Sequence, residues 1–131
     1  MAKPTNTGFG RVLVAVYATF ALAATARAAV QLASRYDEAP LAYLLSALAA
    51  VVYVVATIAL ARSARAAALA AVTFELIGVL VVGTLSVLDS EAFPDETVWS
   101  AYGRGYAFIP LVLPFVGLWW LRRTVRPHRT G

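Results

Sequence analysis

Four long apolar runs constrain this chain more than any other feature of its sequence. They span about residues 12–33, 41–61, 66–88 and 106–121. Runs of this kind match the roughly 20 residues that an α-helix needs to cross about 30 Å of hydrocarbon. The chain is 61% hydrophobic and 14% charged, which leaves too little polar surface for a water-soluble domain. We therefore predict an all-α fold, an integral membrane four-helix bundle that forms a single transmembrane domain over residues 1–131.

The connections between the runs are short, except for the last. Residues 62–65 leave room only for a tight turn, whereas residues 89–105 form a long connection. Within it, residues 94–96 read Pro-Asp-Glu, which is typical of the first turn of a helix. One interpretation is a short helix in the outer membrane interface, with Trp99 and Tyr102 at headgroup level. The other is an irregular loop anchored by the same aromatic side chains.

The basic residues predict an orientation, because short loops rich in Lys and Arg stay in the cytoplasm. Most of them precede the first run, lie in the second connection or follow the fourth run. Arg35 and Arg104 lie on the other side, together with most of the acidic residues. We expect a multi-pass protein of the cell (plasma) membrane with both termini in the cytoplasm. The cations on the predicted inner side are Lys3, Arg11, Arg62, Arg65, Arg122, Arg123, Arg126 and Arg129.

A signal peptide is the alternative interpretation of the first run. Lys3 and Arg11 precede an apolar stretch that ends in the small residues 24–26, a pattern that resembles a cleavage site. The helical pattern continues past that point to Gln31 and Leu32. We therefore expect a retained helix.

Polar side chains concentrate on one face of each of the first two runs. Side chains three or four residues apart share a helix face, and lipid offers polar groups no hydrogen-bond partner. We expect both faces to line the interior of the bundle. The first face contains Tyr17, Phe20, Ala24, Arg27 and Gln31, and the second contains Tyr43, Ser46, Ala50, Tyr53 and Thr57.

Glu75 is the strongest candidate for a functional residue, because an ionisable group in the middle of a membrane helix is costly. Counting from the turn at residues 62–65 sets Tyr53 level with Glu75 and predicts a hydrogen bond between them. Arg27 is predicted either to lean toward Glu75 or to extend outward to the acidic residues of the first connection. The carboxyl group has either a structural role or a role in coupling protons to a substrate, and the sequence does not decide between these roles.

Pro110 and Pro114 lie inside the fourth run. Each removes the backbone hydrogen bond to the carbonyl four residues earlier, so we predict a kinked helix. Gly78, Gly83 and the many alanines of the first run predict surfaces on which helices approach closely.

Several classes of chemistry are not expected. The chain has no cysteine, and its single histidine, His128, lies near the end. Thiolate chemistry and a histidine-rich metal site are therefore implausible. We find no nucleophile paired with a base and no phosphate-binding glycine loop, and we expect neither enzymatic activity nor a cofactor. The net charge of +4 follows membrane topology and predicts no binding to nucleic acid.

The stretches at residues 74–86 and 105–114, read with the length and composition, resemble uncharacterised small four-helix integral membrane proteins of actinobacteria. The resemblance implies no activity. In size and helix count the chain is also similar to small multidrug-resistance transporters. That family carries its membrane glutamate in the first helix, whereas Glu75 lies in the third run, so the similarity is one of architecture.

Three functional hypotheses follow. The first is a non-enzymatic accessory or scaffolding protein that packs in the lipid bilayer against its own copies or a larger membrane complex. The second is a proton-coupled small-molecule transporter that acts as an oligomer, with Glu75 as the coupling carboxylate. The third is a lipid-binding membrane protein.

Overall fold

The computed structural model describes residues 4–34, 40–89 and 99–124 of the chain, and these residues are all-helical apart from turns and short irregular segments. The first three helices coincide closely with the first three apolar runs of the sequence. In chain order the elements are α1 (Phe9–Ser34), α2 (Pro40–Ala61), α3 (Arg65–Leu88), the 3-10 segment η3 (Ser100–Tyr106) and α4 (Ile109–Arg123).

Three of the described helices are long and apolar enough to cross a membrane. The apolar lengths are Phe9–Gln31 in α1, Tyr43–Ala61 in α2 and Arg65–Leu88 in α3. The fourth helix, α4, has only 15 residues. At about 1.5 Å per residue it is roughly 22 Å long, shorter than the hydrocarbon core of a bilayer.

The start of α4 differs from the prediction for a physical reason. The apolar run begins at Tyr106, but Ala107 and Phe108 have φ angles of 56° and 59°, so the helix begins at Ile109. Pro110 then lies in the first turn, where its missing N–H interrupts no helical hydrogen bond. The predicted kink at Pro110 is therefore wrong, and Pro114 is the proline that lies inside the helix.

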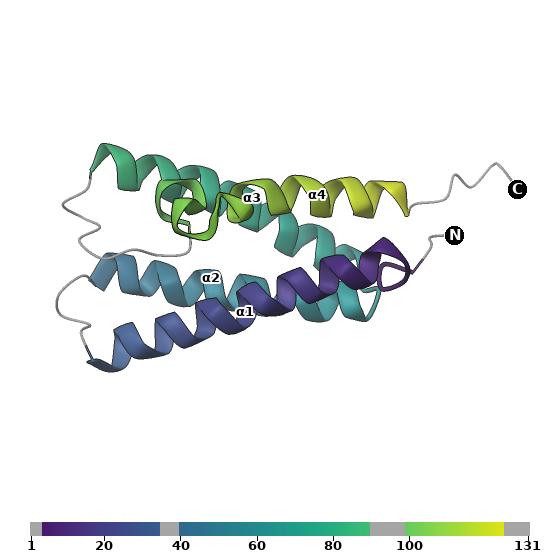
Figure 1. Cartoon of the computed structure of the whole chain (residues 1–131), viewed down its shortest axis with the longest axis horizontal. Coiled ribbons are helices and arrows are strands. Elements are labelled where there is room, and N and C mark those ends of the chain that lie inside the picture. The colour runs from purple at the N-terminus through teal and green to yellow at the C-terminus, as the bar shows by residue number, and fades with distance from the viewer. Residues whose placement is uncertain (1–3, 35–39, 90–98, 125–131) are drawn as a thin grey trace, which may run out of the picture.

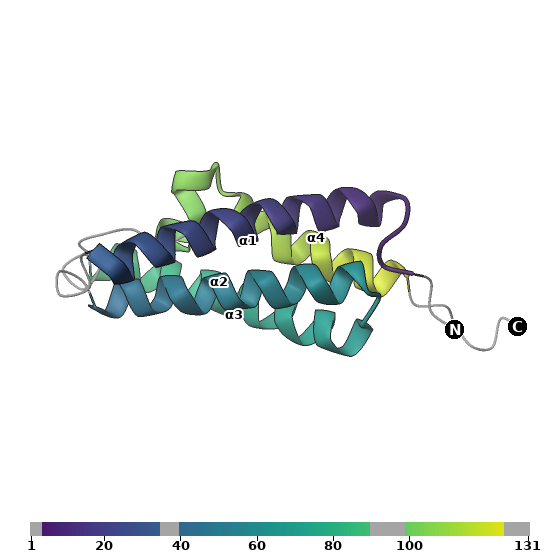
Figure 2. The same ribbon diagram turned by 90° about the horizontal axis from the view of Figure 1, so that it is seen from below.

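The helices lie side by side along one long direction (Figures 1 and 2). α1 packs on α2, α2 on α3, and α3 on both α4 and η3. In Figure 1, η3 and α4 follow one another along α3, with α4 over the half of the molecule that contains the α2–α3 turn.

The segment before α1 closes one end of the molecule. The Thr5 hydroxyl donates to the carbonyl oxygen of Leu60 at 2.5 Å, and the Thr5 N–H donates to Ser63 Oγ at 2.9 Å. Asn6 Nδ2 donates to the Ala61 carbonyl at 2.6 Å, and the indole N–H of Trp120 donates to the Thr5 carbonyl at 3.0 Å. The last carbonyls of a helix have no hydrogen-bond partner in the following turn of that helix. At the end of α2, the side chains of Thr5 and Asn6 donate hydrogen bonds to these carbonyls.

Arg65 joins α3 to the end of α4 at the same end of the molecule. Its guanidinium donates to the carbonyl oxygen of Leu121 at 2.6 Å and to Thr124 Oγ1 at 2.9 Å. A positive group at a helix C-terminus is stabilising, because the last carbonyls carry a partial negative charge. The start of α1, the α2–α3 turn and the end of α4 therefore meet at one end.

The segment around η3 folds back against α3. Ala101, Tyr102 and Gly103 have φ angles of 49°, 60° and 84°, so the backbone turns sharply there. The Ala101 N–H donates to Ser86 Oγ at 2.7 Å. This irregular backbone is thus held by a side chain of α3.

Trp99 corrects one of the sequence interpretations. One interpretation placed Trp99 and Tyr102 at headgroup level in an interfacial helix, and the other had them anchor an irregular loop. In the structure the Trp99 side chain is fully buried, and both rings pack on glycines of α3. A Cβ atom at Gly78 would lie 2.6 Å from the Trp99 ring, and one at Gly83 would lie 2.4 Å from the Tyr102 ring. These glycines admit aromatic rings, where we had predicted helix contacts. The predicted helix start at residues 94–96 lies outside the described residues.

The outer surface of the helices is largely apolar, while several polar side chains are buried together with the apolar core. Tyr17, Tyr43, Ser46 and Glu75 are buried, whereas large aliphatic and aromatic side chains are exposed on all four helices. The exposed group includes Val12 and Leu22 on α1, Leu44 and Ile58 on α2, Phe74, Ile77 and Leu88 on α3, and Val112 and Phe115 on α4.

Candidate functional site

Glu75 lies at the centre of the helical assembly, with none of its surface exposed. It is flanked along α3 by Val72 and Gly78, which are also buried and lie on the same face of the helix. Spacings of three residues keep these positions on one helix face, so the fold of α3 alone directs the carboxyl group inward.

The carboxyl group is held by Tyr17 of α1. The Tyr17 hydroxyl, which is fully buried, donates to Glu75 Oε1 at 2.5 Å. The other oxygen, Oε2, is buried and has no hydrogen-bond partner among the described residues. Glu75 is therefore half satisfied, with one fixed oxygen and one that remains available to a donor.

Tyr53 has a different role from the predicted one. Its ring is level with the site, 6.1 Å from the Tyr17 ring between centroids, but its hydroxyl accepts a hydrogen bond from the Trp99 indole at 3.2 Å. The hydrogen bond to Glu75 comes from α1 because Tyr17 faces the same interior space from the opposite side. Counting residues outward from the α2–α3 turn predicted the position of Tyr53 along the bundle correctly, but it predicted the wrong hydrogen-bond partner for Glu75.

Aromatic rings enclose the site. The Phe20 ring stacks on Tyr53 at 5.9 Å, and the Trp99 ring lies 6.3 Å from Tyr53. On the α4 side, Gly117 leaves room for the Tyr17 hydroxyl, since a Cβ there would lie 3.0 Å from it. All four helices and the residue before η3 thus contribute to a closely packed centre.

Arg27 is half-buried and lies ten residues beyond Tyr17 in α1. That distance is roughly 15 Å along the helix. The carboxyl group of Glu75 bonds to Tyr17 and not to Arg27. Of the two predictions for Arg27, a contact with Glu75 is therefore wrong, and the other, extension toward the acidic residues of the first connection, involves residues outside the described ones.

The remaining predicted polar residues lie toward the other end of α1 and α2. Tyr43, Ser46 and Gln31 are all buried, as a polar face directed inward requires. Ser46 is seven residues from Tyr53, roughly 10 Å along α2, and its Oγ has no hydrogen-bond partner among the described residues. The structure therefore separates these side chains from Glu75.

The sequence interpretation missed two contributors. One of the two interpretations placed Trp99 at the membrane surface and neither placed it beside Glu75, and Gly117 was not considered. The sequence did contain a signal for Trp99. Two glycines of α3, at positions 78 and 83, leave room for the two aromatic rings at positions 99 and 102.

The arrangement offers one carboxyl group and two phenols in an apolar, aromatic enclosure. Such a group can fasten helices through its hydrogen bond, or can take and release a proton at Oε2. The described residues contain no cluster of three His, Cys, Asp or Glu side chains that would hold a metal ion. The acids Glu91, Asp95 and Glu96 lie outside the described residues.

Comparison of the chain with protein-family models, with curated proteins and with solved structures finds no match.

Proposed function

We propose that this protein is a non-enzymatic accessory or scaffolding protein of the cell membrane, which assembles through α1 with its own copies or with a larger complex. Its helices form a four-helix bundle, with both termini on the cytoplasmic side. The outward apolar surface and inward polar groups support insertion in lipid, because a bilayer solvates apolar side chains and leaves polar groups without partners.

In this proposal, α4 and the segment at residues 99–108 together form the fourth crossing of the membrane. A helix of 15 residues is too short to cross alone, and irregular backbone is tolerated at membrane depth where it is buried in protein. The packing of Trp99 and Tyr102 on α3 and the bond from Ala101 to Ser86 support this assignment.

The orientation rests on charge. The described end that contains the α2–α3 turn has Arg11, Arg62, Arg65, Arg122 and Arg123, whereas Asp89 lies at the opposite end of α3. Clusters of Arg near short turns favour the cytoplasm. We therefore place the turn and both ends of the chain on that side.

The observation that carries the scaffolding role is an exposed stripe along α1. Its members recur at alternating spacings of four and three residues, and all are exposed. Apart from Leu22 its members are small, and small residues at this spacing let two membrane helices approach closely. The stripe consists of Ala15, Thr19, Leu22, Ala26, Ala29 and Ala33.

The site around Glu75 supports the same role. The four buried side chains Glu75, Tyr17, Tyr53 and Trp99 form two hydrogen bonds, of which one joins α1 to α3 and the other joins α2 to Trp99, whose ring packs on α3. A rigid interior keeps the outer stripe straight enough to serve as a contact surface.

Purification from membranes in mild detergent after brief cross-linking tests the proposal. We expect an oligomer or a complex with other membrane proteins, and we expect Ala26→Leu to lower its recovery about fivefold, since bulk on the stripe blocks close approach. Ala70→Leu, at an exposed position of α3, is the matched control. Recovery of the wild-type chain as a lone monomer, or equal losses in both variants, contradicts the proposal.

A proton-coupled transporter is the second candidate, and the available Oε2 atom of Glu75 favours it. It predicts that liposomes containing the protein take up protons when a lipophilic cation is added on the other side. Glu75→Gln is expected to abolish this exchange while the protein still folds, and Tyr102→Phe is expected to leave it unchanged. Proton movement that is equal in the wild type and Glu75→Gln excludes the coupling role.

A further inference from the structure

An open hollow lies on the surface of α4, near the end of that helix. Its volume is about 360 Å³, and it is lined by Trp119, Arg122 and Arg123. That volume is roughly ten times the share of one water molecule in the liquid, so the hollow has room for a phosphate group and the atoms attached to it. Polar and apolar atoms contribute to its wall in similar amounts.

The hollow presents hydrogen-bond donors that the protein itself does not use. Arg122 and Arg123 are exposed, and neither makes a hydrogen bond or an ion pair with the described residues. The Arg123 guanidinium lies over the Trp119 ring, 5.6 Å from its centroid. The indole N–H of Trp119 also has no acceptor within the part of the chain that the structure describes. These donors suit an anionic ligand.

The Trp119 ring is held from the side of α1. The Phe9 ring meets it edge-on, with 5.9 Å between the centroids, and meets the Trp120 ring at 5.4 Å. The indole N–H of Trp120 is bonded to the Thr5 carbonyl, which fixes the second ring. The wall of the hollow is therefore supported by packing between α1 and α4.

Acids of the described helices do not balance the charge of the hollow. The sequence has no Asp or Glu in residues 1–36 or 97–131. The acids that the structure describes are Glu75, which is buried, and Asp89, which lies at the opposite end of α3.

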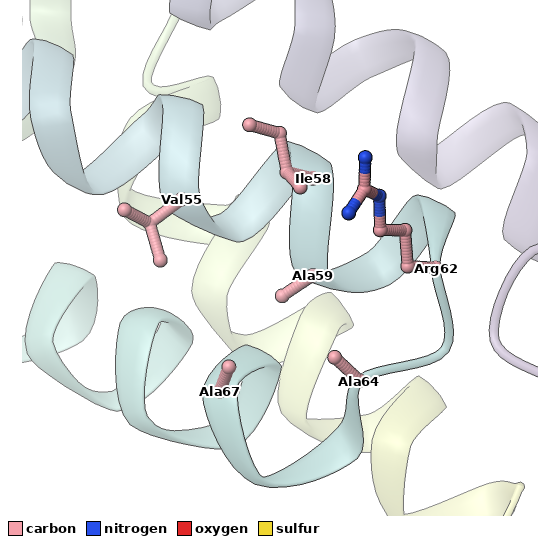
Figure 3. A pocket seen from close by; sticks show the side chains of 6 residues that line it. All are labelled: Val55, Ile58, Ala59, Arg62, Ala64 and Ala67. Carbon is pink, nitrogen blue, oxygen red and sulfur yellow. The ribbon is translucent and has the colours of Figure 1, made fainter.

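Other arginines at this end of the molecule are placed differently. Arg65 donates its hydrogen bonds to Leu121 and Thr124. The Arg62 guanidinium is directed toward α1 and away from Ala59 and Ala67, which border an apolar groove between α2 and α3 (Figure 3). The hollow on α4 thus combines two available guanidinium groups with an aromatic ring, whereas that groove does not.

An apolar face of α4 leads away from the hollow. Val112, Phe115 and Trp119 are 54%, 54% and 50% exposed. Their spacings of three and four residues place them on one side of the helix, and Arg122 continues the same pattern. From Val112 to Trp119 this face extends roughly 10 Å along α4.

We propose that the hollow binds one anionic phospholipid, with its phosphate on Arg122 and Arg123 and an acyl chain along the apolar face of α4. The inference rests on the membrane location in the proposed function and not on the scaffolding role. Guanidinium groups bind phosphate through paired hydrogen bonds. A free phosphate ion would use the arginines and leave the apolar face uncovered, whereas a phospholipid uses both. Basic side chains that follow an interfacial Trp lie at headgroup level, where anionic lipids attract them.

Native mass spectrometry of the full-length protein tests the proposal. The delipidated protein is given equal amounts of phosphatidylglycerol and phosphatidylcholine, and we expect phosphatidylglycerol adducts to be about fivefold more abundant. Arg122→Gln combined with Arg123→Gln should remove that preference. Arg11→Gln combined with Arg62→Gln removes the same charge from exposed positions outside the hollow and should retain it. Equal losses in the two double variants would mean that net charge attracts the lipid, which overturns the proposal.

A charge-preserving variant keeps the test decisive if the Gln variant does not fold. Arg122→Lys combined with Arg123→Lys retains both charges but loses the paired donors of each guanidinium, so the preference should fall about twofold. An unchanged preference would contradict the binding of phosphate by these two side chains.

The apolar part of the hollow is tested separately. Trp119→Ala should reduce the phosphatidylglycerol adducts about threefold, because it removes the ring beneath Arg123 and the start of the apolar face. Phe74→Ala removes a ring of similar exposure from α3 and should leave the adducts unchanged. Inorganic phosphate in excess should not displace the lipid. Displacement by phosphate, or no effect of Trp119→Ala, overturns the proposal in favour of a site for a free anion.

Flotation with vesicles distinguishes failure of this proposal from failure of the membrane location. If the wild type floats with vesicles of either lipid but shows no preference in mass spectrometry, the hollow is not a site for anionic lipid and the membrane location stands. If the wild type does not float, the membrane location fails, and this proposal fails with it.

Discussion

Two regions of the molecule are held in place by different means. At the α2–α3 turn, Thr5, Asn6 and Arg65 donate hydrogen bonds to backbone carbonyls at the ends of α2 and α4. Along the far half of α3, Trp99 and Tyr102 fill spaces left by glycines. The first region is fixed by the pairing of donors with acceptors, and the second mainly by shape.

The difference follows from what each region must satisfy. Helix ends carry carbonyls without partners, so side-chain donors stabilise them most. The segment at residues 99–108 lies across α3, whose backbone N–H and C=O groups are already hydrogen-bonded within the helix. Close packing is therefore the main source of stability available to this segment. Substitutions in the two regions should therefore act by different mechanisms and with different magnitudes.

The largest effect is expected for Trp99→Ala. Removing a fully buried indole leaves a cavity beside Gly78 and deprives Tyr53 of a hydrogen-bond donor, so the free energy of unfolding should fall by about 3–5 kcal/mol. Reversible unfolding in mixed detergent micelles, followed by circular dichroism, measures it. Trp119→Ala, at a half-exposed position, is the control and should cost much less.

A second substitution sharpens this test of packing by shape. Gly78→Ala should be destabilising in the wild type, because the new Cβ would lie 2.6 Å from the Trp99 ring. In the Trp99→Ala background the same change should be nearly neutral. Additive effects of the two substitutions would show that the ring and the glycine do not depend on each other.

An intermediate effect is expected for Arg65→Met, which keeps an unbranched apolar side chain, shorter than that of Arg, and removes its donors. The carbonyl of Leu121 and the hydroxyl of Thr124 lose a charged partner, so the free energy of unfolding should fall by about 1.5–3 kcal/mol. Arg62→Met removes the same charge three residues away and should change stability by less than about 0.5 kcal/mol. Equal losses would mean that net charge, and not the hydrogen bonds, stabilises this end.

The smallest effect is expected for Thr5→Val, a substitution of nearly equal shape. It removes the donor to the carbonyl of Leu60 and should cost about 1 kcal/mol. Thr7→Val, at an exposed position, is the control. Increased hydrogen exchange confined to the α2–α3 turn in Thr5→Val would confirm that the effect is local, whereas exchange increased throughout α1 would contradict that interpretation.

The fold was predictable where periodicity and length dominate. The apolar runs predicted an all-helical chain, and the structure confirms four helices, of which α1, α2 and α3 have the length of a membrane crossing. The start of α4 was not predicted, because hydropathy does not distinguish a helix from irregular backbone buried against one. Pro110 was the relevant signal, since a proline with apolar residues before it fits the first turn as well as a kink.

The candidate site was predictable only in part. Burial of Tyr17, Tyr53 and Glu75 follows from their helix faces. Their pairing does not, because it depends on where helices cross, and a shift of a few ångströms between α1 and α3 changes the partner of a carboxyl group. The position of Tyr53 relative to Glu75 could be predicted because a short turn joins α2 to α3. No short connection joins α1 to α3, so the position of Tyr17 relative to Glu75 could not be predicted in this way.

The hydrogen bonds of Thr5 have a consequence for the order of assembly. Its partners Leu60 and Ser63 are synthesised more than fifty residues later, and Trp120 later still. Since a chain folds from its N-terminus as it is made, the segment before α1 must wait for the first hairpin to form and for the last helix to arrive. These contacts can therefore form only after α4 has been made, and a product truncated before Trp120 should leave its N-terminal segment open to proteases.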